Sequence, residues 1–494
     1  MARTAGAGVK DAIVIGAGIG GLSAAIELGA RGLRVRVLEA ADALGGKAGT
    51  ATIDGIELDT GPSLLTMPDV FDAILRRAGT TLKDELDLRA HDPWFQYLWP
   101  DGARLDVKPG LADTLASVRA TFGTQAENEL RTYLDHARSI WEAAAPTFVY
   151  GEAPSLGRVL RLGPRALPLL ARIEPLRSLQ ASIHARVREP HLRMLLERYA
   201  TYNGSDPRRA PATLGCIAHV ELSLGAWGIE GGVQALVRAL ARAAERVGVE
   251  LCTGARVARI LIEQGRACGV ELASGERIRA RAVIANADPA HVFGELISKL
   301  SSGPLEPSMS GWTAILRARR TPRAPHTVLF PRNYDEEFRD VFDRGRPPSE
   351  PTVYLCAQER AHGRSGWAEH EPVFVMVNAP PEPIDGASPD AWWTDLASRV
   401  QTRLRQAELT SEDDALVWQR TPRELAARFP GSRGAIYGAS SSSRAAAFLR
   451  PANEVRAIPG LFLGSGGAHP GGGMPLAAIS GRLAANAAAK HLAR

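Results

Sequence analysis

The chain has 494 residues, about three times the length of a typical domain, so we expect two or three domains. A composition of 45% hydrophobic and 23% charged residues excludes a disordered or fibrous protein. No apolar run approaches the roughly 18 residues of a spanning helix, and the first residues show no secretory signal, so a cytoplasmic location is expected.

The formal net charge is +5, which is typical of a protein that meets an anionic partner such as nucleic acid or a lipid surface. A preference for arginine codons explains the same excess equally well. The four cysteines show no metal-ligand spacing, so we expect reduced thiols and no metal site; they are Cys216, Cys252, Cys268 and Cys356.

The N-terminal stretch predicts a strand over 11–15, a helix over 22–31 and a second strand over 33–38. Between the first strand and the helix lies GxGxxG, formed by Gly16, Gly18 and Gly21, with Gly20 inside it. These glycines permit a tight turn, close approach of a pyrophosphate, and close packing of the helix on the sheet. Glu39 ends the second strand, where a carboxylate accepts ribose hydroxyls, so we predict dinucleotide binding.

A second glycine pair decides between FAD and NAD. Gly45, Gly46 and Lys47 follow the ribose acid, and a turn-rich segment with Gly61 and Pro62 comes next. This order is typical of flavoproteins of the amine oxidase and phytoene desaturase type, so we predict FAD.

Residues 64–130 read as short helices and strands, at 70–78, 95–99 and 104–107. Residues 155–202 read as helical and are broken by Pro164, Pro168, Pro175 and Pro190. Within 155–198 lie nine Arg and three Glu with aliphatic residues between them, a pattern that favours a membrane-interface insert. The alternative is an arginine-rich solvated subdomain.

The rest of the chain returns to the nucleotide domain twice. A helix over 233–247 and strands over 249–253, 255–263, 267–272, 277–279 and 282–285 make the second pass. Residues 306–440 carry strands at 312–317, 352–357 and 373–378 and a helix at 391–407. A strand over 460–464, a glycine-rich loop and a helix over 476–492 make the third pass, whose helix N-terminus offers amides to an anion.

We therefore predict an α/β protein with a Rossmann-like FAD-binding domain of the glutathione-reductase type, assembled from discontinuous segments. An α+β substrate domain with a helical, membrane-facing insert over 155–202 completes it. The predicted boundaries are 1–105, 221–305 and 441–494 for the FAD-binding domain, and 106–220 and 306–440 for the substrate domain.

Nearly end to end, the chain resembles the bacterial carotenoid (phytoene) desaturase family, and within it the 1-hydroxycarotenoid 3,4-desaturases or methoxyneurosporene dehydrogenases. The motifs that carry the resemblance are DTGPSLLTM (59–67), WPDGARLD (99–106), RYATYNGSDP (198–207), APATLGCIAHVE (210–221), WGIEGG (227–232), LCAQER (355–360), FPGSRGAIYG (429–438) and GGAHPGGGMPLAAISG (466–481). The resemblance implies an amine-oxidase-like fold and FAD contacts at the glycines named above, at Glu39, Lys47, Val257 and Asp288, and at Gly473, Met474 and Pro475.

It also implies that an acyclic carotenoid is desaturated by hydride transfer to flavin with loss of a proton. Polar candidates near the substrate are Tyr199, Tyr202, Asn203 and His219, and His469 is the candidate catalytic residue; for each, a bracing hydrogen bond is the alternative. The expected partners are the cytoplasmic face of a membrane, dioxygen or a quinone as electron acceptor, and other carotenoid enzymes.

Four alternatives stay open. A phytoene or neurosporene desaturase and a carotenoid cis–trans isomerase belong to the same family. A flavin amine oxidase shares the N-terminal motifs, although its frequent C-terminal attachment cysteine is absent, since the last cysteine is Cys356. A prenyl-lipid chaperone without FAD is disfavoured by the intact glycines and Glu39. No nucleic-acid-binding module is present in the sequence.

Overall fold

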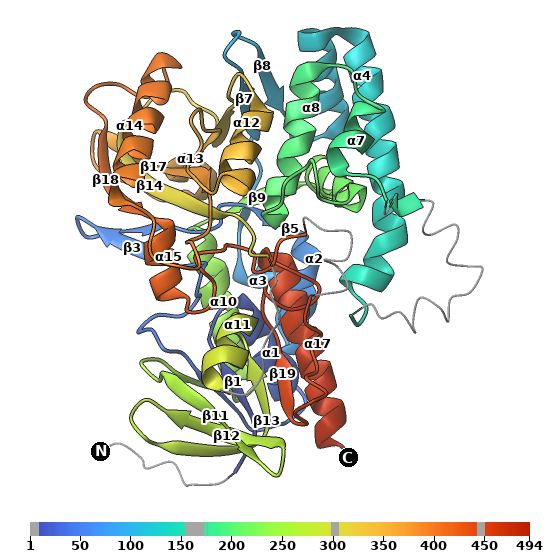
Figure 1. Ribbon diagram of the computed structural model, residues 1–494, viewed down its shortest axis with the longest axis vertical. Coiled ribbons are helices and arrows are strands. Elements are labelled where there is room, and N and C mark those ends of the chain that lie inside the picture. The colour runs from blue at the N-terminus through green and yellow to red at the C-terminus, as the bar shows by residue number, and fades with distance from the viewer. Residues whose placement is uncertain (1–8, 154–171, 175, 298–305, 442–449) are drawn as a thin grey trace.

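The computed structural model describes residues 9–153, 172–174, 176–297, 306–441 and 450–494. The molecule is elongated, with two lobes along its long axis (Figure 1). The lower lobe of Figure 1 contains β1, β11, β12, β13, β19, α1 and α17, and the chain ends there. The upper lobe contains β7, β8, β14, β17, α4, α8 and α14.

The lower lobe is built on a seven-stranded sheet in the order β10-β2-β1-β13-β12-β11, with β19 also paired to β13. Strands β1, β2, β10, β13 and β19 run parallel, whereas β11 and β12 are antiparallel. Ala285 pairs with Ile15 on one side and Leu463 on the other, so three distant segments form one sheet, as predicted. The strands are β1 (Lys10–Ile15), β2 (Val35–Leu38), β10 (Glu250–Cys252), β11 (Val257–Glu263), β12 (Arg266–Leu272), β13 (Arg277–Ala285) and β19 (Leu461–Leu463).

Four helices pack in the main core of this lobe: α1 (Ile19–Gly29), α2 (Pro68–Arg77), α10 (Val233–Arg246) and α17 (Met474–Leu492). Every residue of α1 is buried. Helices α1 and α17 touch backbone to backbone, because a Cβ added to Gly481 would overlap the carbonyl oxygen of Gly20. The two helices that begin at predicted phosphate-binding loops are thus side by side (Figure 1).

The upper lobe is built on a second seven-stranded sheet, ordered β18-β14-β17-β16-β15-β7-β8. Only the β15–β7 pairing is parallel. Because β7 and β8 lie in this sheet, the chain leaves the first lobe before residue 95, earlier than the predicted boundary at 105. The strands are β7 (Phe95–Leu98), β8 (Arg104–Val107), β14 (Ser310–Arg319), β15 (His326–Leu329), β16 (Val353–Ala357), β17 (His370–Ala379) and β18 (Ala415–Arg420). Helix α14 (Asp390–Gln406) packs Trp393, Leu396 and Val400 on the sheet.

Smaller elements link the lobes. A hairpin turns at Asp54 and Gly55, both with positive φ, and a three-stranded sheet has the order β5-β9-β6. Its strands and the hairpin's are β3 (Thr50–Ile53), β4 (Ile56–Asp59), β5 (Leu65–Thr66), β6 (Leu88–Arg89) and β9 (Ala226–Ile229). The short helices are α3 (Leu82–Glu85), η1 (Ala145–Val149), α7 (Leu179–His184), α8 (Pro190–Glu197), η3 (Arg198–Asn203), η4 (Ala212–Gly215), α9 (Cys216–His219), η5 (Val220–Leu224), α11 (Pro289–His291), η6 (Val292–Leu296), α12 (Tyr334–Phe338), η7 (Arg339–Asp343), α13 (Gln358–His362) and α15 (Pro422–Arg428).

Two elements differ from the prediction. The short elements predicted at 70–78, 95–99 and 104–107 are present as α2, β7 and β8, but no helix was predicted where Leu111–Ala144 form α4, a 34-residue helix with a kink at Gly123, whose φ is 89°. That glycine hides the helical period from a reading of sequence alone. Strand β13 is continuous rather than two pieces, and its burial changes from alternating to complete where it enters the parallel sheet.

The predicted insert over 155–202 lies partly outside the described residues, since 154–171 and 175 are not described. Within its described part, Pro190 is the first residue of α8 rather than a break, as expected where a helix begins. Among the helices that the structure describes, none combines the length and apolar character that crossing a membrane requires.

Candidate active site

One cavity of about 620 Å³ runs from the carboxyl ends of the parallel strands to the second sheet. Its walls include most of the predicted cofactor residues: Gly16, Gly18, Gly20, Glu39, Gly45, Gly46, Lys47, Gly61, Pro62, Val257, Asp288, Gly473, Met474 and Pro475. Gly21 is not part of the wall. A Cβ there would overlap the carbonyl oxygen of Gly16, so this glycine permits close packing of the turn, and the FAD contact that the resemblance implies at Gly21 is not seen in the cavity wall.

Asn286 explains the glycine turn and was not predicted. It follows β13, and its side-chain Nδ2 donates to the carbonyl oxygen of Gly16 at 3.2 Å. A Cβ on Gly16 would lie 2.7 Å from the Asn286 carbonyl oxygen, and one on Gly18 would lie 2.9 Å from Nδ2. The absence of side chains at both positions therefore lets the loop rest on Asn286 while it lines the cavity.

Glu39 is held with its carboxylate fixed at the cavity. The backbone N–H of Ala17 donates to Oε2 at 2.7 Å, and that of Ala41 donates to Oε1 at 2.9 Å. A carboxylate has about four lone-pair sites, so two or so remain for further donors. This geometry suits the two hydroxyls of a ribose.

Two helix N-termini face the same space without a capping side chain. Helix α1 follows Gly18 and helix α17 follows Gly473, and neither N-cap residue supplies a side-chain hydrogen bond to the first turn. Uncapped N–H groups and the positive end of the helix dipole favour an anion. The residues from both first turns that line the cavity are Ile19, Gly20, Met474, Pro475 and Ala477.

The charged side chains of the wall are mostly cationic. They are Lys47, Arg198, Arg256, Arg420 and Arg428, against Glu39 and Asp288. Burial lowers the pKa of Lys47 to about 8, against a smaller opposing effect of Asp288. The Lys47 ammonium donates to the carbonyl oxygens of Ala435 and Ile436, each at 2.8 Å. Two uncapped helix N-termini and an excess of cations over acids in the cavity wall suit an anionic diphosphate, so these residues fit FAD.

The far end of the cavity is walled by the second sheet. Alternate residues of β17, Phe374 and Met376, lie on one face and line the cavity, as do Gly311 and Thr313 of β14. Tyr354 of β16 adds a phenol, whose oxygen lies 2.6 Å from Ser63 Oγ and 2.8 Å from His326 Nδ1. This end is apolar with a few precisely placed polar groups, the usual character of a small-molecule site.

Of the four polar candidates predicted near the substrate, only Tyr202 lines this cavity. Tyr199 is fully buried behind it and donates to Glu221 Oε1 at 2.9 Å. His219 instead lines a second cavity of about 210 Å³ beside α4, and burial lowers its pKa. Asn203 donates to Ser441 Oγ at 2.7 Å. The predicted segment therefore reaches the cavity through Tyr202, while Tyr199, Asn203 and His219 do not line it.

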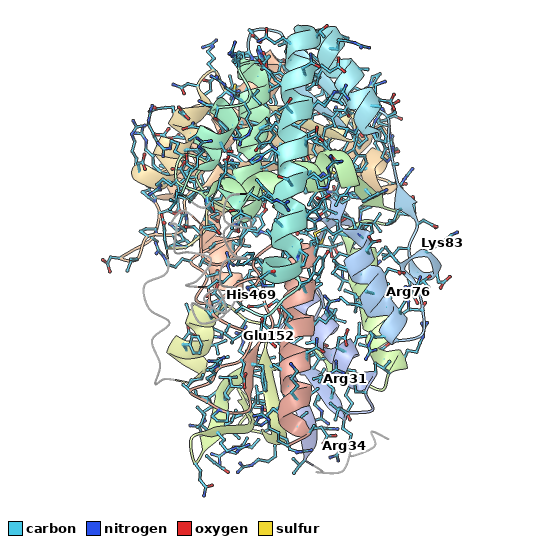
Figure 2. All side chains as sticks on the ribbon, turned by 90° about the vertical axis from the view of Figure 1, so that its right-hand side faces the viewer. Arg31, Arg34, Arg76, Lys83, Glu152 and His469 are labelled. Carbon is cyan, nitrogen blue, oxygen red and sulfur yellow. The ribbon has the colours of Figure 1, made fainter. Side chains whose placement is uncertain are left out.

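His469 is buried in the C-terminal glycine loop and is not among the described residues that line the main cavity. Its Nε2 lies 3.0 Å from the carbonyl oxygen of Gly151. Figure 2 shows His469 close to Glu152, below the end of α4 and beside the first turns of α17. The side chain thus joins the loop to the chain that leaves η1, a bracing contact.

The sequence reading missed Arg198, Tyr354 and Glu221. Arg198 and Tyr354 line the cavity, and Glu221 lies beneath Tyr202, whose hydroxyl donates to it. All three belong to motifs that carry the family resemblance or adjoin one, but no spacing rule connects them.

Comparison with known proteins agrees with this geometry. The family model for flavin containing amine oxidoreductases matches residues 19–325. Hydroxyneurosporene desaturase from Rubrivivax gelatinosus is 35% identical over 97% of this chain and 93% of its own length. The enzyme of that name from Cereibacter sphaeroides is 36% identical over 98% of both chains. Among solved structures, cyclohexylamine oxidase from Brevibacterium oxydans superposes with a TM-score of 0.59 at 16% identity, over 99% of this chain and 100% of that one, which shows the shared fold. The chain therefore belongs to the flavin-containing amine oxidoreductase family and, within it, to the carotenoid desaturases, and it is an FAD-dependent oxidoreductase.

Proposed function

We propose that the protein introduces the C3–C4 double bond into acyclic carotenoids that carry a hydroxyl or methoxy group at C1, such as hydroxyneurosporene. Relatives with the printed name hydroxyneurosporene desaturase, 35% and 36% identical over nearly the whole chain, support this substrate class. The observation that carries the proposal is one continuous cavity, which joins Glu39 and the glycine turn to the apolar wall of Phe374 and Met376.

The reaction removes a hydride from one carbon and a proton from its neighbour. FAD, when bound, supplies the hydride acceptor. The residues of this chain orient the polyene and exclude water, with Phe374, Met376 and Ile436 as apolar wall. The charge that develops on carbon is allylic and spreads over the polyene, so a weak proton acceptor suffices.

The test is expression in cells that accumulate 1-hydroxy acyclic carotenoids, with parallel cells that accumulate phytoene or neurosporene. The expected product is lighter by two hydrogens and absorbs at longer wavelength, and it forms only from the 1-hydroxy substrate. An unchanged mass with altered retention would instead indicate isomerisation. Desaturation of phytoene would move the protein to the sister group, and turnover of small amines alone would contradict the proposal.

We also propose that the protein works at the cytoplasmic surface of a membrane, where its oil-soluble substrate resides. Five large hydrophobic side chains among the described residues are exposed. Leu176 lies within the basic stretch, and Tyr150 comes shortly before it. Leu176 is 75% exposed, and the exposed Arg172 and Arg177 flank it. Figure 2 shows further basic side chains, Arg31, Arg34, Arg76 and Lys83, along one side of the lower lobe.

Co-sedimentation with anionic vesicles tests this location. Leu176→Ser is expected to weaken binding, and replacing Arg172 and Arg177 by Gln is expected to weaken it further, because apolar insertion and phosphate attraction add. Ile384→Ser is the matched control, since Ile384 is 81% exposed but lies elsewhere in the chain. Equal vesicle binding by all variants would contradict a membrane role for this segment.

The same preparation tests the electron acceptor, which we propose to be dioxygen or a membrane quinone. Anaerobic, dithionite-reduced protein is expected to recover its oxidised flavin absorbance when air or a soluble quinone is added. No recovery with either would contradict the proposal.

A further inference from the structure

Arg198 is a buried cation at the substrate end of the cavity. It begins η3, is 7% exposed and lines the cavity wall. Its guanidinium carbon lies 5.1 to 5.9 Å from the centroids of four aromatic rings, which belong to Phe95, Tyr97, Tyr202 and Tyr354. Ring faces stabilise a desolvated cation, so the cage keeps the charge in place without consuming its N–H groups.

Several N–H groups of Arg198 have no hydrogen-bond acceptor among the described residues. Its Nη1 donates to Tyr202 OH at 3.2 Å and to Tyr97 OH at 3.4 Å. A guanidinium has five N–H donors, and no acceptor among the described residues pairs with Nε or Nη2. Nε and Nη2 are not fully buried, because every fully buried side-chain atom without a partner in the described residues belongs to another group. The remaining donors therefore open on the cavity.

Glu221 orients the hydroxyl of Tyr202, the second polar group beside the cavity. The hydroxyls of Tyr199 and Tyr202 both donate to its carboxylate, which is 5% exposed. Burial raises the pKa of Glu221, and the guanidinium of Arg198 and the two phenols oppose that rise. The only proton of Tyr202 is thus directed away from the cavity, and its oxygen is an acceptor that faces Arg198. Glu221 acts through Tyr202 and is a positioning residue.

This polar pair lies beside the turn-rich segment 59–63, which in the flavoproteins that the chain resembles lies close to the flavin ring. Ser63 follows Gly61 and Pro62, and its Oγ lies 2.6 Å from Tyr354 OH, whose ring is one wall of the Arg198 cage. In a C3–C4 desaturation the oxygen on C1 is only about 4 Å, or some three bonds, from the carbons that react. A site that reads this oxygen must therefore lie at the flavin end, where Arg198 and Tyr202 are.

We propose that Arg198 and Tyr202 form the subsite that binds the oxygen at the substrate's end and thereby select oxygenated carotenoids. Arg198 donates to a hydroxyl or a methoxy oxygen, and Tyr202 accepts the proton of a hydroxyl. A chain that ends in hydrocarbon leaves the guanidinium donors without a partner, which disfavours it. This inference rests on the proposed function and names its specificity residues.

The test compares three substrates with the FAD-loaded protein: a 1-hydroxy acyclic carotenoid, its methyl ether, and the analogue without oxygen at C1. Arg198→Met is expected to lower kcat/KM for both oxygenated substrates by about 10- to 100-fold, while the deoxy analogue changes less than about threefold. Tyr202→Phe is expected to reduce turnover of the hydroxyl substrate more than that of its ether. Arg405→Met, an exposed arginine on α14, is the matched control.

Two further variants cover the case in which Arg198→Met does not fold because Glu221 is left uncompensated. Arg198→Met with Glu221→Gln removes both charges and is expected to show the same selectivity loss. Arg198→Lys keeps the positive charge but not the planar set of guanidinium N–H donors, so it is expected to lose part of the preference for oxygenated substrates. A uniform loss on all three substrates would overturn the inference and leave the desaturase proposal standing. Failure of the unmodified protein to desaturate any of the three would refute the proposed function itself.

Discussion

The close contact between α1 and α17 predicts that a side chain at position 481 weakens cofactor binding. In Gly481→Ala, the new Cβ would overlap the carbonyl oxygen of Gly20 and lie 2.8 Å from its carbon and 3.2 Å from the amide nitrogen of Ala24. Carbon atoms in contact prefer about 3.5–4.0 Å, so the two helices must separate by roughly 1 Å. Overpacking of this kind costs about 1–3 kcal/mol. Because the first turns of both helices line the cavity, the separation also moves the amides that face the diphosphate.

Apoprotein and FAD-loaded protein are compared by thermal unfolding, and FAD affinity is measured by quenching of FAD fluorescence. We expect a fall in Tm of several degrees and a loss of FAD affinity of about 10- to 100-fold, as for roughly 1 Å of misplacement. Gly294→Ala is the matched control, because nothing lies within 4 Å of a Cβ at that exposed position. Wild-type Tm and FAD affinity in Gly481→Ala would refute the close packing of α1 on α17.

Three further predictions follow from single residues. Glu39→Gln is expected to weaken FAD binding by about 10-fold or more, because it replaces the carboxylate that accepts hydrogen bonds from the ribose hydroxyls. An unchanged Kd in fluorescence titration would contradict that role. Burial lowers the pKa of Lys47 to about 8 in the free protein, from 10.5 for exposed lysine, so FAD affinity is expected to fall as the pH rises from 8 to 10.5. In Lys47→Met the affinity is expected to be weaker and independent of pH over this range. If the variant's affinity changed with pH as the wild type's does, a contact between Lys47 and FAD would be ruled out. Burial lowers the pKa of His362 from 6.5 to about 4, so between these values the unfolded chain binds more protons than the folded protein, and stability falls as the pH drops. The Tm of His362→Gln is therefore expected to fall less steeply than that of the wild type between pH 6.5 and 4. Identical slopes would show that the imidazole is not buried in its neutral form.

The nucleotide-binding end was largely predictable. The strand, the glycine turn, the helix and Glu39 are separated by short, fixed numbers of residues, because one βαβ unit must supply the turn, the helix N-terminus and the ribose acid. The same holds for the C-terminal loop at Gly473. The structure adds Asn286, which no spacing rule connects to Gly16 although it holds that turn.

The substrate end was only partly predictable. The segment with Tyr199 and Tyr202 was identified, but which side chain faces the cavity was not. A kink at Gly123 concealed α4, and the chain enters the second sheet at β7, before the predicted boundary at 105. His469 has polar character and a glycine-rich setting, yet its imidazole contacts the backbone of Gly151.

The sequence by itself therefore determined the cofactor, the fold class and the family, because these depend on local motifs and on their order along the chain. Only the tertiary structure decided how Arg198, Glu221 and Tyr354 come together. Arg198 of η3 and Tyr354 of β16 line the cavity, and Glu221 of η5 lies behind Tyr202. A buried charge is stable only where packing supplies rings and acceptors from several elements at once. Such a set has no fixed spacing in the sequence and becomes visible only after the chain has folded.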